Sequence, residues 1–295
     1  MNRFSNALRV AACLAALAGF SRAATAAEIL IVDEKSQPES LAVAPDGTLY
    51  VGSASTPFVY KIAPGTTTPV KFLDYSADGP GTFFFGQLVD GDTLWSCVLT
   101  PVAGVTPVQR HTALIGSDRR TGARKLRWDL PGPNSTCNDM AVGPDKALYI
   151  SDTANAKIFR LAPGAQSAEL WLEHRSLTGI DGLTFLNGVL YINSVFFNNL
   201  YRIPVDASGK AGVPVEIWMD APVKGPDGMR AVGNILLHAE NGSGKIDSLT
   251  INGDTAHVTV LKDGLKQPTA VEPAGNVIWI AERASGKAVS IPMPK

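Results

Sequence analysis

The chain has 295 residues, of which 45% are hydrophobic and 18% charged, and its formal net charge is −1. This balance suits one globular domain with a large core, and no break in composition marks a second domain. No basic run is present, so the sequence argues against nucleic acid or an anionic membrane surface as a partner. The 28 glycines and 20 prolines indicate many turns, which favours an all-β fold.

Residues 1–26 have the features of a secretory signal peptide, which leaves 27–295 as the mature domain. Arg3 and Arg9 form a basic start, 10–20 is an apolar run too short to span a bilayer, and Ala24-Thr25-Ala26 is a small-residue cleavage site. Removal of the signal leaves 23 basic and 27 acidic residues, a formal charge of −4. We therefore expect a bacterial periplasmic or secreted protein without a membrane anchor.

A pattern of strand, turn and strand recurs along the rest of the chain. In its clearest copy, 41–51, two apolar runs flank Asp46-Gly47, and 140–150 repeats this copy almost position for position. Six residues mark one position of the second strand, 42 to 54 residues apart: Tyr50, Trp95, Tyr149, Tyr191, Leu237 and Trp279. This spacing is typical of propeller blades, so we predict an all-β fold, a six-bladed β-propeller.

The two ends of the domain are expected to meet in one blade. Residues 28–32 form a strand before the first repeat, and 288–292 form a strand after the last one. Pairing of these strands would bury edges that are otherwise exposed. The N-terminal strand is therefore predicted to close the last blade.

Cys97 and Cys137 are the cysteines that remain after the signal peptide is removed. They fall in neighbouring repeats of a protein that we expect in an oxidising compartment, so a disulfide between them is one possibility. Strands of adjacent blades seldom meet at the separation that a disulfide needs. The sequence therefore favours two buried free thiols over a bridge.

Candidate ligands stand at the start of the first strand of each repeat, a position that we call the slot. Four of the six slots hold Glu39, Asn138, Asp181 and Asp227. The first strand of a propeller blade lines the central channel, so these side chains would converge near its axis. Carboxylates so close would repel one another, and a hard divalent cation with oxygen ligands removes that repulsion.

The other two slots hold Phe85 or Gly86, and Gln267. Taken singly, each acid or amide also fits a structural role, because Asp and Asn at strand ends bond nearby backbone groups. The position shared by four such residues is what favours a cation site.

Three segments resemble a known family of six-bladed propellers. They are Pro38-Glu39-Ser40, Asn138-Asp139 and Pro226-Asp227-Gly228-Met229, and the family is that of gluconolactonase, regucalcin (senescence marker protein) and the luciferin-regenerating enzyme. The resemblance extends in repeat layout over 28–295. It implies one divalent metal, often calcium or zinc, held by a Glu, two Asn and an Asp.

The metal ligands carry over residue by residue. Glu39, Asn138 and Asp227 match the family's ligands in type, whereas Asp181 stands where the family usually has Asn. The added charge favours tight binding of a hard cation and weakens it as a Lewis acid. Oxygen donors alone favour calcium, with magnesium, manganese or zinc as alternatives. Thr136 occupies the substrate-binding position where sugar lactonases of the family carry Arg, so we expect a less polar lactone or ester.

The implied activity is metal-dependent hydrolysis of a small-molecule lactone or ester by a monomer. The metal would polarise the carbonyl, Asp227 would take a proton from the attacking water, and Asn138 and Asp181 would orient the substrate. Phe83-Phe84-Phe85 and Val195-Phe196-Phe197 are candidates for an apolar rim, or else for core.

Two other functions fit the same fold. The segment 152–160 resembles an NHL repeat, whose propellers bind ligands or proteins without catalysis. A strictosidine-synthase-like enzyme without an essential metal is the other alternative. The sequence contains no Gly-x-Ser-x-Gly, no phosphate loop and no Cys-x-x-Cys, which argues against serine hydrolase, nucleotide-dependent and thiol redox chemistry.

Overall fold

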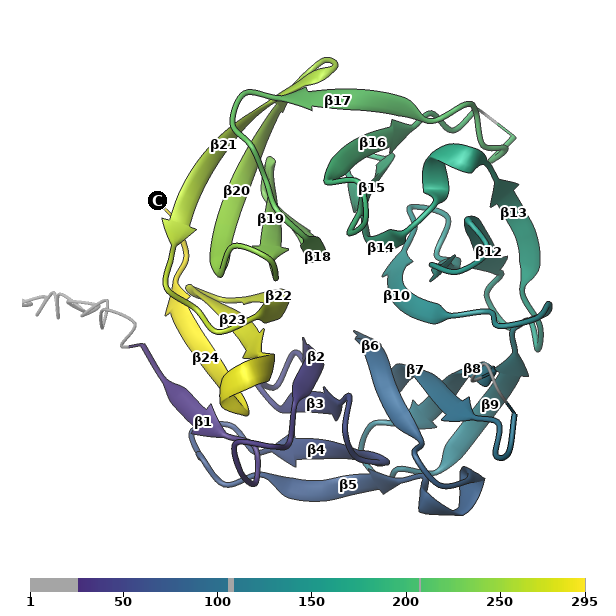
Figure 1. The fold of residues 1–295 in the computed structure, drawn as a ribbon, viewed down its shortest axis with the longest axis vertical. Helices are drawn as coiled ribbons and strands as arrows, with labels where there is room; N and C mark the ends of the chain where they lie inside the picture. The colour runs from purple at the N-terminus through teal and green to yellow at the C-terminus, as the bar shows by residue number, and fades with distance from the viewer. Residues whose placement is uncertain (1–25, 106–108, 207, 295) are drawn as a thin grey trace, which may run out of the picture.

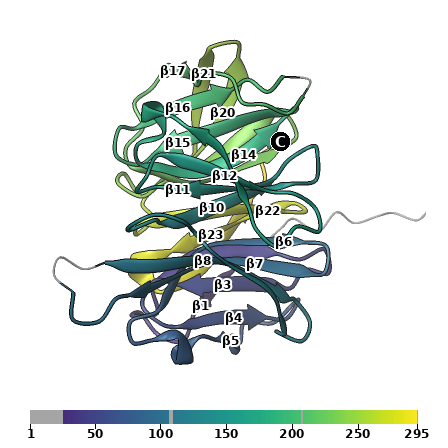
Figure 2. The same ribbon diagram turned by 90° about the vertical axis from the view of Figure 1, so that its right-hand side faces the viewer.

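The computed structural model describes residues 26–105, 109–206 and 208–294, whose strands form a ring of mainly antiparallel sheets around one axis (Figure 1). This arrangement is an all-β propeller. Figure 2, the edge-on view, shows strands such as β7 and β8 running across the thickness of the ring. No helix among these residues is long and apolar enough to cross a membrane. The expected signal peptide lies, apart from Ala26, outside the described residues.

Four of the sheets have four strands each. Three of them are simple meanders in chain order: β2 (Pro38–Val43), β3 (Leu49–Ser53), β4 (Phe58–Ile62) and β5 (Val70–Asp74); β6 (Phe83–Asp90), β7 (Thr93–Pro101), β8 (Arg110–Asp118) and β9 (Arg124–Asp129); β10 (Cys137–Val142), β11 (Leu148–Asp152), β12 (Lys157–Leu161) and β13 (Glu169–Glu173). The fourth joins the two ends of the domain: β22 (Pro268–Ala274), β23 (Val277–Glu282), β24 (Lys287–Pro292) and β1 (Glu28–Leu30). Because β1 pairs with β24, the expectation that the N-terminal strand completes the last sheet is confirmed.

The remaining sheet has eight strands and consists of two consecutive meanders. They are β14 (Ile180–Leu186), β15 (Val189–Ser194), β16 (Asn199–Ile203) and β17 (Val215–Met219), followed by β18 (Pro226–Val232), β19 (Ile235–Glu240), β20 (Lys245–Asn252) and β21 (Thr255–Lys262). The meanders join where β17 and β21 pair in parallel, over Trp218↔Thr255 and Met219↔Ala256. Three short 3₁₀ turns lie between strands: η1 (Ser76–Asp78), η2 (Arg175–Leu177) and η3 (Arg283–Ser285).

The innermost strands surround the axis, and each contacts the next one round the ring. These strands are β2, β6, β10, β14, β18 and β22 (Figure 1). Apolar side chains fill the space between neighbouring sheets, as where buried Tyr50 and Phe84 share one cluster. The predicted repeat holds in register, because Tyr50 pairs with Ala42 and Tyr149 pairs with Ala141 in equivalent hairpins.

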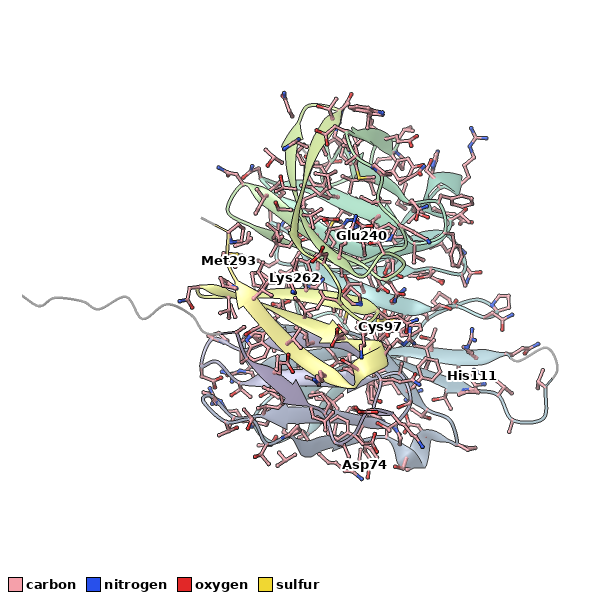
Figure 3. The ribbon with its side chains drawn as sticks, turned by 60° about the vertical axis from the view of Figure 1, so that its left-hand side comes forward. Asp74, Cys97, His111, Glu240, Lys262 and Met293 are labelled. Atoms are coloured by element: carbon pink, nitrogen blue, oxygen red, sulfur yellow. A yellow bond between two sulfur atoms is a disulfide. The ribbon has the colours of Figure 1, made fainter. Side chains whose placement is uncertain are left out.

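Cys97 and Cys137 form a disulfide, so the expectation of two free thiols is wrong. Cys97 lies in β7, inside the molecule (Figure 3), and Cys137 opens β10. Their Cα atoms are 5.2 Å apart, within the usual range for a disulfide. The bridge is possible because the inner strand β10 packs on β7 of the preceding sheet, as well as on β6.

Replacing both cysteines should destabilise the propeller. The bridge closes a loop with a sequence separation of 40. The chain-entropy model then gives a loss of about 4 kcal/mol in the free energy of unfolding for Cys97→Ser/Cys137→Ser. Urea unfolding of the double variant and of the wild type measures this difference. Two free thiols in the unreduced wild type, counted by mass spectrometry after alkylation, would contradict the assignment.

Candidate functional site

Each innermost strand has a register shift near its start, the mark of a β-bulge. The shifts lie between Pro38 and Ser40, Phe84 and Gln87, Cys137 and Met140, Ile180 and Leu183, Pro226 and Met229, and Pro268 and Ala270. All four candidate ligands fall inside these shifts. A bulge redirects the side chains within it, which explains why one repeat position aims at the axis.

The register corrects one slot of the repeat. In the last sheet the shift encloses Thr269, whereas the sequence pattern places Gln267 in the slot. Proline precedes both Glu39 and Thr269, at positions 38 and 268, so the alignment through proline is the better guide.

Glycines in the bulges let the innermost strands approach one another closely. A Cβ on Gly182 would lie 2.6 Å from the carbonyl oxygen of Asp227, and one on Gly228 would lie 2.7 Å from that of Thr269. Any side chain at these positions would push neighbouring inner strands apart. Because these glycines have no side chain, the strand that carries one slot acid can lie close to the strand that carries the next slot residue.

At three of the slots, the end of the second strand fixes the backbone that leads into the slot. An acidic side chain at this end accepts a hydrogen bond from a backbone N–H two or three residues before the slot. The pairs are Asp152 with Thr136 at 2.8 Å, Glu240 with Lys224 at 2.6 Å, and Glu282 with Lys266 at 2.6 Å. Hydrogen bonds within the blade therefore fix the backbone at these three slots without any ligand.

The four predicted ligands converge on one cavity of about 10 Å³. Glu39, Asn138, Asp181 and Asp227 all line it, and the three acids are no more than 9% exposed. The volume is that of about one water-sized sphere. The cavity can therefore hold a single ion, and it is too small for a substrate ring.

Hydrogen bonds tie the slot side chains to one another and to the loops above them. The amide nitrogen of Asn138 donates to Asp181 at 3.0 Å and to the Thr153 hydroxyl at 2.9 Å. Asn241 donates to the carboxylate of Asp227 at 3.2 Å. The guanidinium Nε of Arg283 lies 3.3 Å from Oε2 of Glu39.

Burial raises the pKa of all three carboxyl groups, and repulsion from neighbouring carboxylates adds to this effect for Asp181 and Asp227. Burial is the main cause for Glu39, and it raises the pKa to about 7 against the opposing charge of Arg283. Burial, followed by the charges of Glu39 and Asp139, raises the pKa of Asp181 to about 8. Burial and then the charges of Asp181 and Glu39 raise the pKa of Asp227 well above its usual value. Ionisation of these carboxyl groups is therefore unfavourable in the cavity, and Arg283 offsets part of the charge of Glu39 only.

The donor set fits a hard divalent cation. Among the described residues, Oε2 of Glu39 is buried without a hydrogen-bond partner, because the Arg283 contact lacks hydrogen-bond geometry. The other donors are two carboxylates and one amide, all of them oxygen ligands that calcium accepts. In the part of the chain that the structure describes, no three Asp, Glu, His or Cys side chains are already placed to ligate one ion. Binding would require these side chains to exchange their present hydrogen bonds for the cation.

Two other groups of predicted residues lie elsewhere. The backbone N–H of Thr136 bonds Asp152, and its hydroxyl donates to the carbonyl of Asn134 at 3.3 Å, so Thr136 is not among the residues that line the cavity. Phe84 is fully buried in the core. Phe196 and Phe197, in contrast, are exposed.

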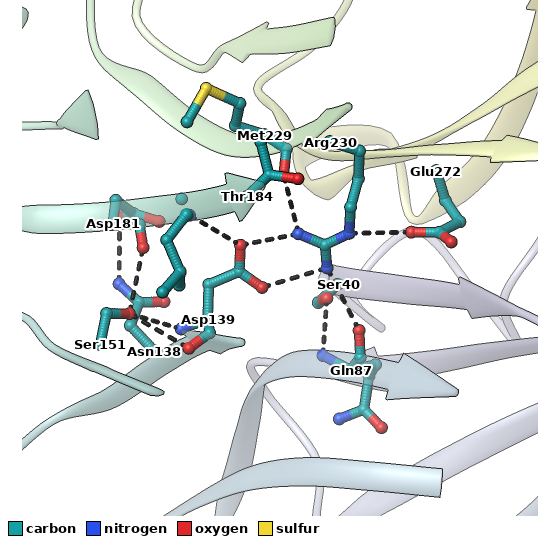
Figure 4. Close-up of polar contacts among 12 residues, drawn as sticks. Ser40, Gln87, Asn138, Asp139, Ser151, Asp181, Thr184, Met229, Arg230 and Glu272 are labelled. Atoms are coloured by element: carbon teal, nitrogen blue, oxygen red, sulfur yellow. Dashed lines mark hydrogen bonds and ion pairs between the residues drawn. The ribbon is translucent and has the colours of Figure 1, made fainter. Parts of the chain in front are cut away.

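Arg230 is a central residue that the sequence reasoning missed (Figure 4). Its guanidinium donates to both carboxylate oxygens of Asp139, at 2.8 and 3.1 Å, and to Glu272 at 3.0 Å. Its side chain is 10% exposed, and it lines the cavity three residues further along β18 than Asp227. These ion pairs connect β10, β18 and β22 beside the cavity, which Asp139 and Arg230 line.

A sequence signal for this network exists. Arg230 interrupts an otherwise apolar inner strand, and Glu272 does so one blade later. A charged residue in a strand that faces a propeller axis needs a buried partner of opposite sign. The pairing of these two residues was therefore predictable, although its link to Asp139 was not.

The chain matches known proteins in part of its sequence and in its fold. A family model described as strictosidine synthase-like, N-terminal, matches residues 24–55, which include Glu39. No curated protein sequence matches the chain.

Several solved propellers superimpose on most of the structure. Virginiamycin B lyase from Staphylococcus aureus has 16% identity and a TM-score of 0.65 over 92% of this chain and 99% of its own. A putative gluconolactonase has 17% identity and a TM-score of 0.65 over 91% and 92%. Regucalcin from Agrobacterium tumefaciens, a calcium-binding protein, has 18% identity and a TM-score of 0.66 over 89% and 92%. At such identities these likenesses establish the β-propeller fold.

Arg230→Leu should cost much more stability than loss of an exposed ion pair. The substitution leaves Asp139 and Glu272 buried without their partner, which lowers the free energy of unfolding by about 3–5 kcal/mol. The matched control is Arg202→Leu, whose partner Asp254 is half exposed, with an expected loss below about 1 kcal/mol. Equal losses in the two variants, measured by urea unfolding, would contradict the assigned role.

The chelated protein should lose stability as the pH rises from 6.5 to 8. Since Glu39 and Asp181 have pKa values of about 7 and 8 when folded, above the unfolded-state values, the folded chain binds more protons in this range. His238, whose pKa burial lowers to about 4, opposes this trend only below its usual 6.5. Unfolding curves at several pH values in a chelator should fall less steeply for Asp181→Asn. A free energy of unfolding that rises over this range in the wild type would refute the electrostatic picture.

Proposed function

We propose that the protein is a hydrolase of lactones or related esters that works with one divalent cation at the slot cavity. The observation that carries the proposal is the convergence of Glu39, Asn138, Asp181 and Asp227 on a cavity of about 10 Å³. These residues come from four inner strands that are far apart in the sequence. A shared ligand explains this arrangement better than four independent structural roles at turns do.

A six-bladed architecture is part of the proposal. Each half of the eight-stranded sheet repeats the meander of the other sheets, with its own bulge and its own slot acid. The parallel pairing of β17 and β21 covers only two residue pairs at the outer edge. We therefore count these halves as two blades.

The proposed family is that of gluconolactonase and regucalcin. Two structures with the same fold support it, one named as a putative gluconolactonase and the other as a calcium-binding regucalcin. Their names agree with the lactone chemistry and with the cation that the slot residues suggest.

Glu39, Asn138, Asp181 and Asp227 would hold the cation. Calcium is the favoured ion because all the donors are oxygens, and magnesium, manganese and zinc are the alternatives. A bound divalent cation supplies positive charge that polarises the substrate carbonyl.

Asp227 is the proposed general base. Its carboxylate takes a proton from the water whose oxygen attacks the carbonyl carbon, and it returns the proton to the ring oxygen as the carbon–oxygen bond breaks. The product is a hydroxy acid. Asn241 orients the Asp227 carboxylate through its hydrogen bond at 3.2 Å. Asn138, which Thr153 holds in place, and Asp181 orient the substrate.

The substrate must bind above the slot cavity, at its mouth. The cavity accommodates one ion, and the ion-paired side chains of Arg230 and Asp139 take up part of its wall. The side chain of Thr136 does not line the cavity, where only the ion fits. Thr136 therefore remains a predicted contact for the substrate, which lies outside the cavity.

The proposed location is the periplasm or the extracellular space, with the chain acting as a monomer on a small molecule. The Cys97–Cys137 disulfide supports an oxidising compartment. The signal peptide at 1–26 remains a prediction from sequence.

A strictosidine-synthase-like enzyme without an essential metal is the second candidate. The family model that matches 24–55 favours it. The two candidates differ in their need for a cation, which a binding measurement decides.

The test is metal content and lactone hydrolysis by the same preparation. We expect about one divalent ion per chain after dialysis, hydrolysis of at least one simple lactone in a pH-stat assay, and loss of hydrolysis in a chelator. Asp227→Asn should lower turnover at least about 100-fold, the typical contribution of a general base. Asp254→Asn, which removes an exposed carboxylate paired with Arg202, is the control and should keep wild-type turnover.

Two results would overturn the proposal. Hydrolysis that persists in the chelator without any bound metal would favour the metal-independent candidate. Undiminished turnover in Asp227→Asn would remove the assigned base.

A further inference from the structure

Two phenylalanines stand exposed at the turn between β15 and β16. Phe196 is 66% exposed and Phe197 is 60% exposed, although both rings are large and apolar. Adjacent aromatic side chains are seldom left in water without a partner to cover them. Neither ring belongs to an aromatic pair among the described residues.

The turn that carries them is firmly built. The N–H of Asn198 donates to the carbonyl of Ser194 at 2.9 Å, and Asn198 takes a positive φ of 59° that closes the turn. The Ser194 hydroxyl donates to the carbonyl of Thr178 at 2.9 Å and accepts from the N–H of Phe197 at 3.3 Å. The backbone that carries the two rings is therefore fixed at the surface.

The same turn lies between two of the slot acids. On one side, Phe196 packs on Gly179, where an added Cβ would lie 2.6 Å from the ring. Gly179 is two residues before Asp181. On the other side, the Asn198 side chain accepts a hydrogen bond at 2.7 Å from the N–H of Gly225, which is two residues before Asp227.

This placement puts an apolar surface beside the two backbone segments that lead into Asp181 and Asp227, which line the slot cavity. The cavity itself has room for one ion, so the rest of any substrate must lie on the surrounding surface. An alkyl chain that rests on the two rings would leave water and cover exposed apolar area.

We propose that Phe196 and Phe197 determine specificity for substrates that carry an alkyl chain next to the reacting carbonyl. The inference rests on the proposed function and names its substrate class, an alkyl-substituted lactone. The chain lies on the phenyl rings while the lactone ring reaches the slot residues.

The test uses five-membered lactones whose alkyl substituent lengthens by two methylenes at a time. For the wild type we expect kcat/KM to rise about twofold per methylene, the gain for partial burial of each group. In Phe196→Ala/Phe197→Ala this dependence should disappear, while hydrolysis of the unsubstituted lactone stays within about twofold of the wild type. The control is Leu170→Ala, a 51% exposed side chain on β13 away from the mouth, which should keep the full dependence.

Binding of the matching alkyl lactams, which resist hydrolysis, separates this inference from the proposed function. In one outcome the wild type cleaves no lactone, but its lactam affinity, measured by calorimetry, rises with chain length and the double variant loses that rise. This outcome supports the alkyl subsite and contradicts the hydrolase proposal. A double variant that retains the chain-length dependence in either assay overturns the subsite. Binding of the wild type to phosphatidylcholine vesicles without any chain-length dependence also overturns it, and assigns the rings to a lipid surface.

Discussion

The repulsion among three buried carboxylates is the constraint on which the centre of this propeller depends. Glu39, Asp181 and Asp227 face one small cavity, and burial raises the pKa of each carboxyl group. The charge of Glu39 raises the pKa of Asp181 and Asp227 further, and the charge of Asp181 raises that of Asp227. A folded protein retains three neighbouring buried carboxylates only when another interaction offsets the free-energy cost of burying their charges. In the proposed function a divalent cation offsets this cost, and protons held by the carboxyl groups would offset it without the cation.

The rest of the architecture holds these groups at close range. β-bulges turn the slot side chains toward the axis, and glycines such as Gly182 and Gly228 let the inner strands approach. Arg230 then balances a second pair of carboxylates, Asp139 and Glu272. Of the slot acids, Glu39 alone lies near a cation, Arg283, among the described residues.

The repeat made the fold and the slots predictable from sequence, because strand periodicity and turn residues are local signals. The convergence of Glu39, Asn138, Asp181 and Asp227 followed from their shared place in that repeat. Features that depend on contacts between blades were harder to predict. The Cys97–Cys137 bridge and the three-way ion pairing of Arg230 join strands whose relative register no local pattern specifies. Thr269 was missed for a different reason: the pattern was aligned two residues too early, at Gln267, whereas the proline at 268 marks the shift that encloses Thr269.

The most direct test of the central claim is the position of a bound cation in crystals grown with calcium or soaked with manganese. The account predicts one anomalous peak at the slot cavity, with oxygens of Glu39, Asn138, Asp181 and Asp227 within about 2.6 Å of the ion. A cavity without a peak at saturating cation, or a peak that these four side chains do not surround, would contradict it.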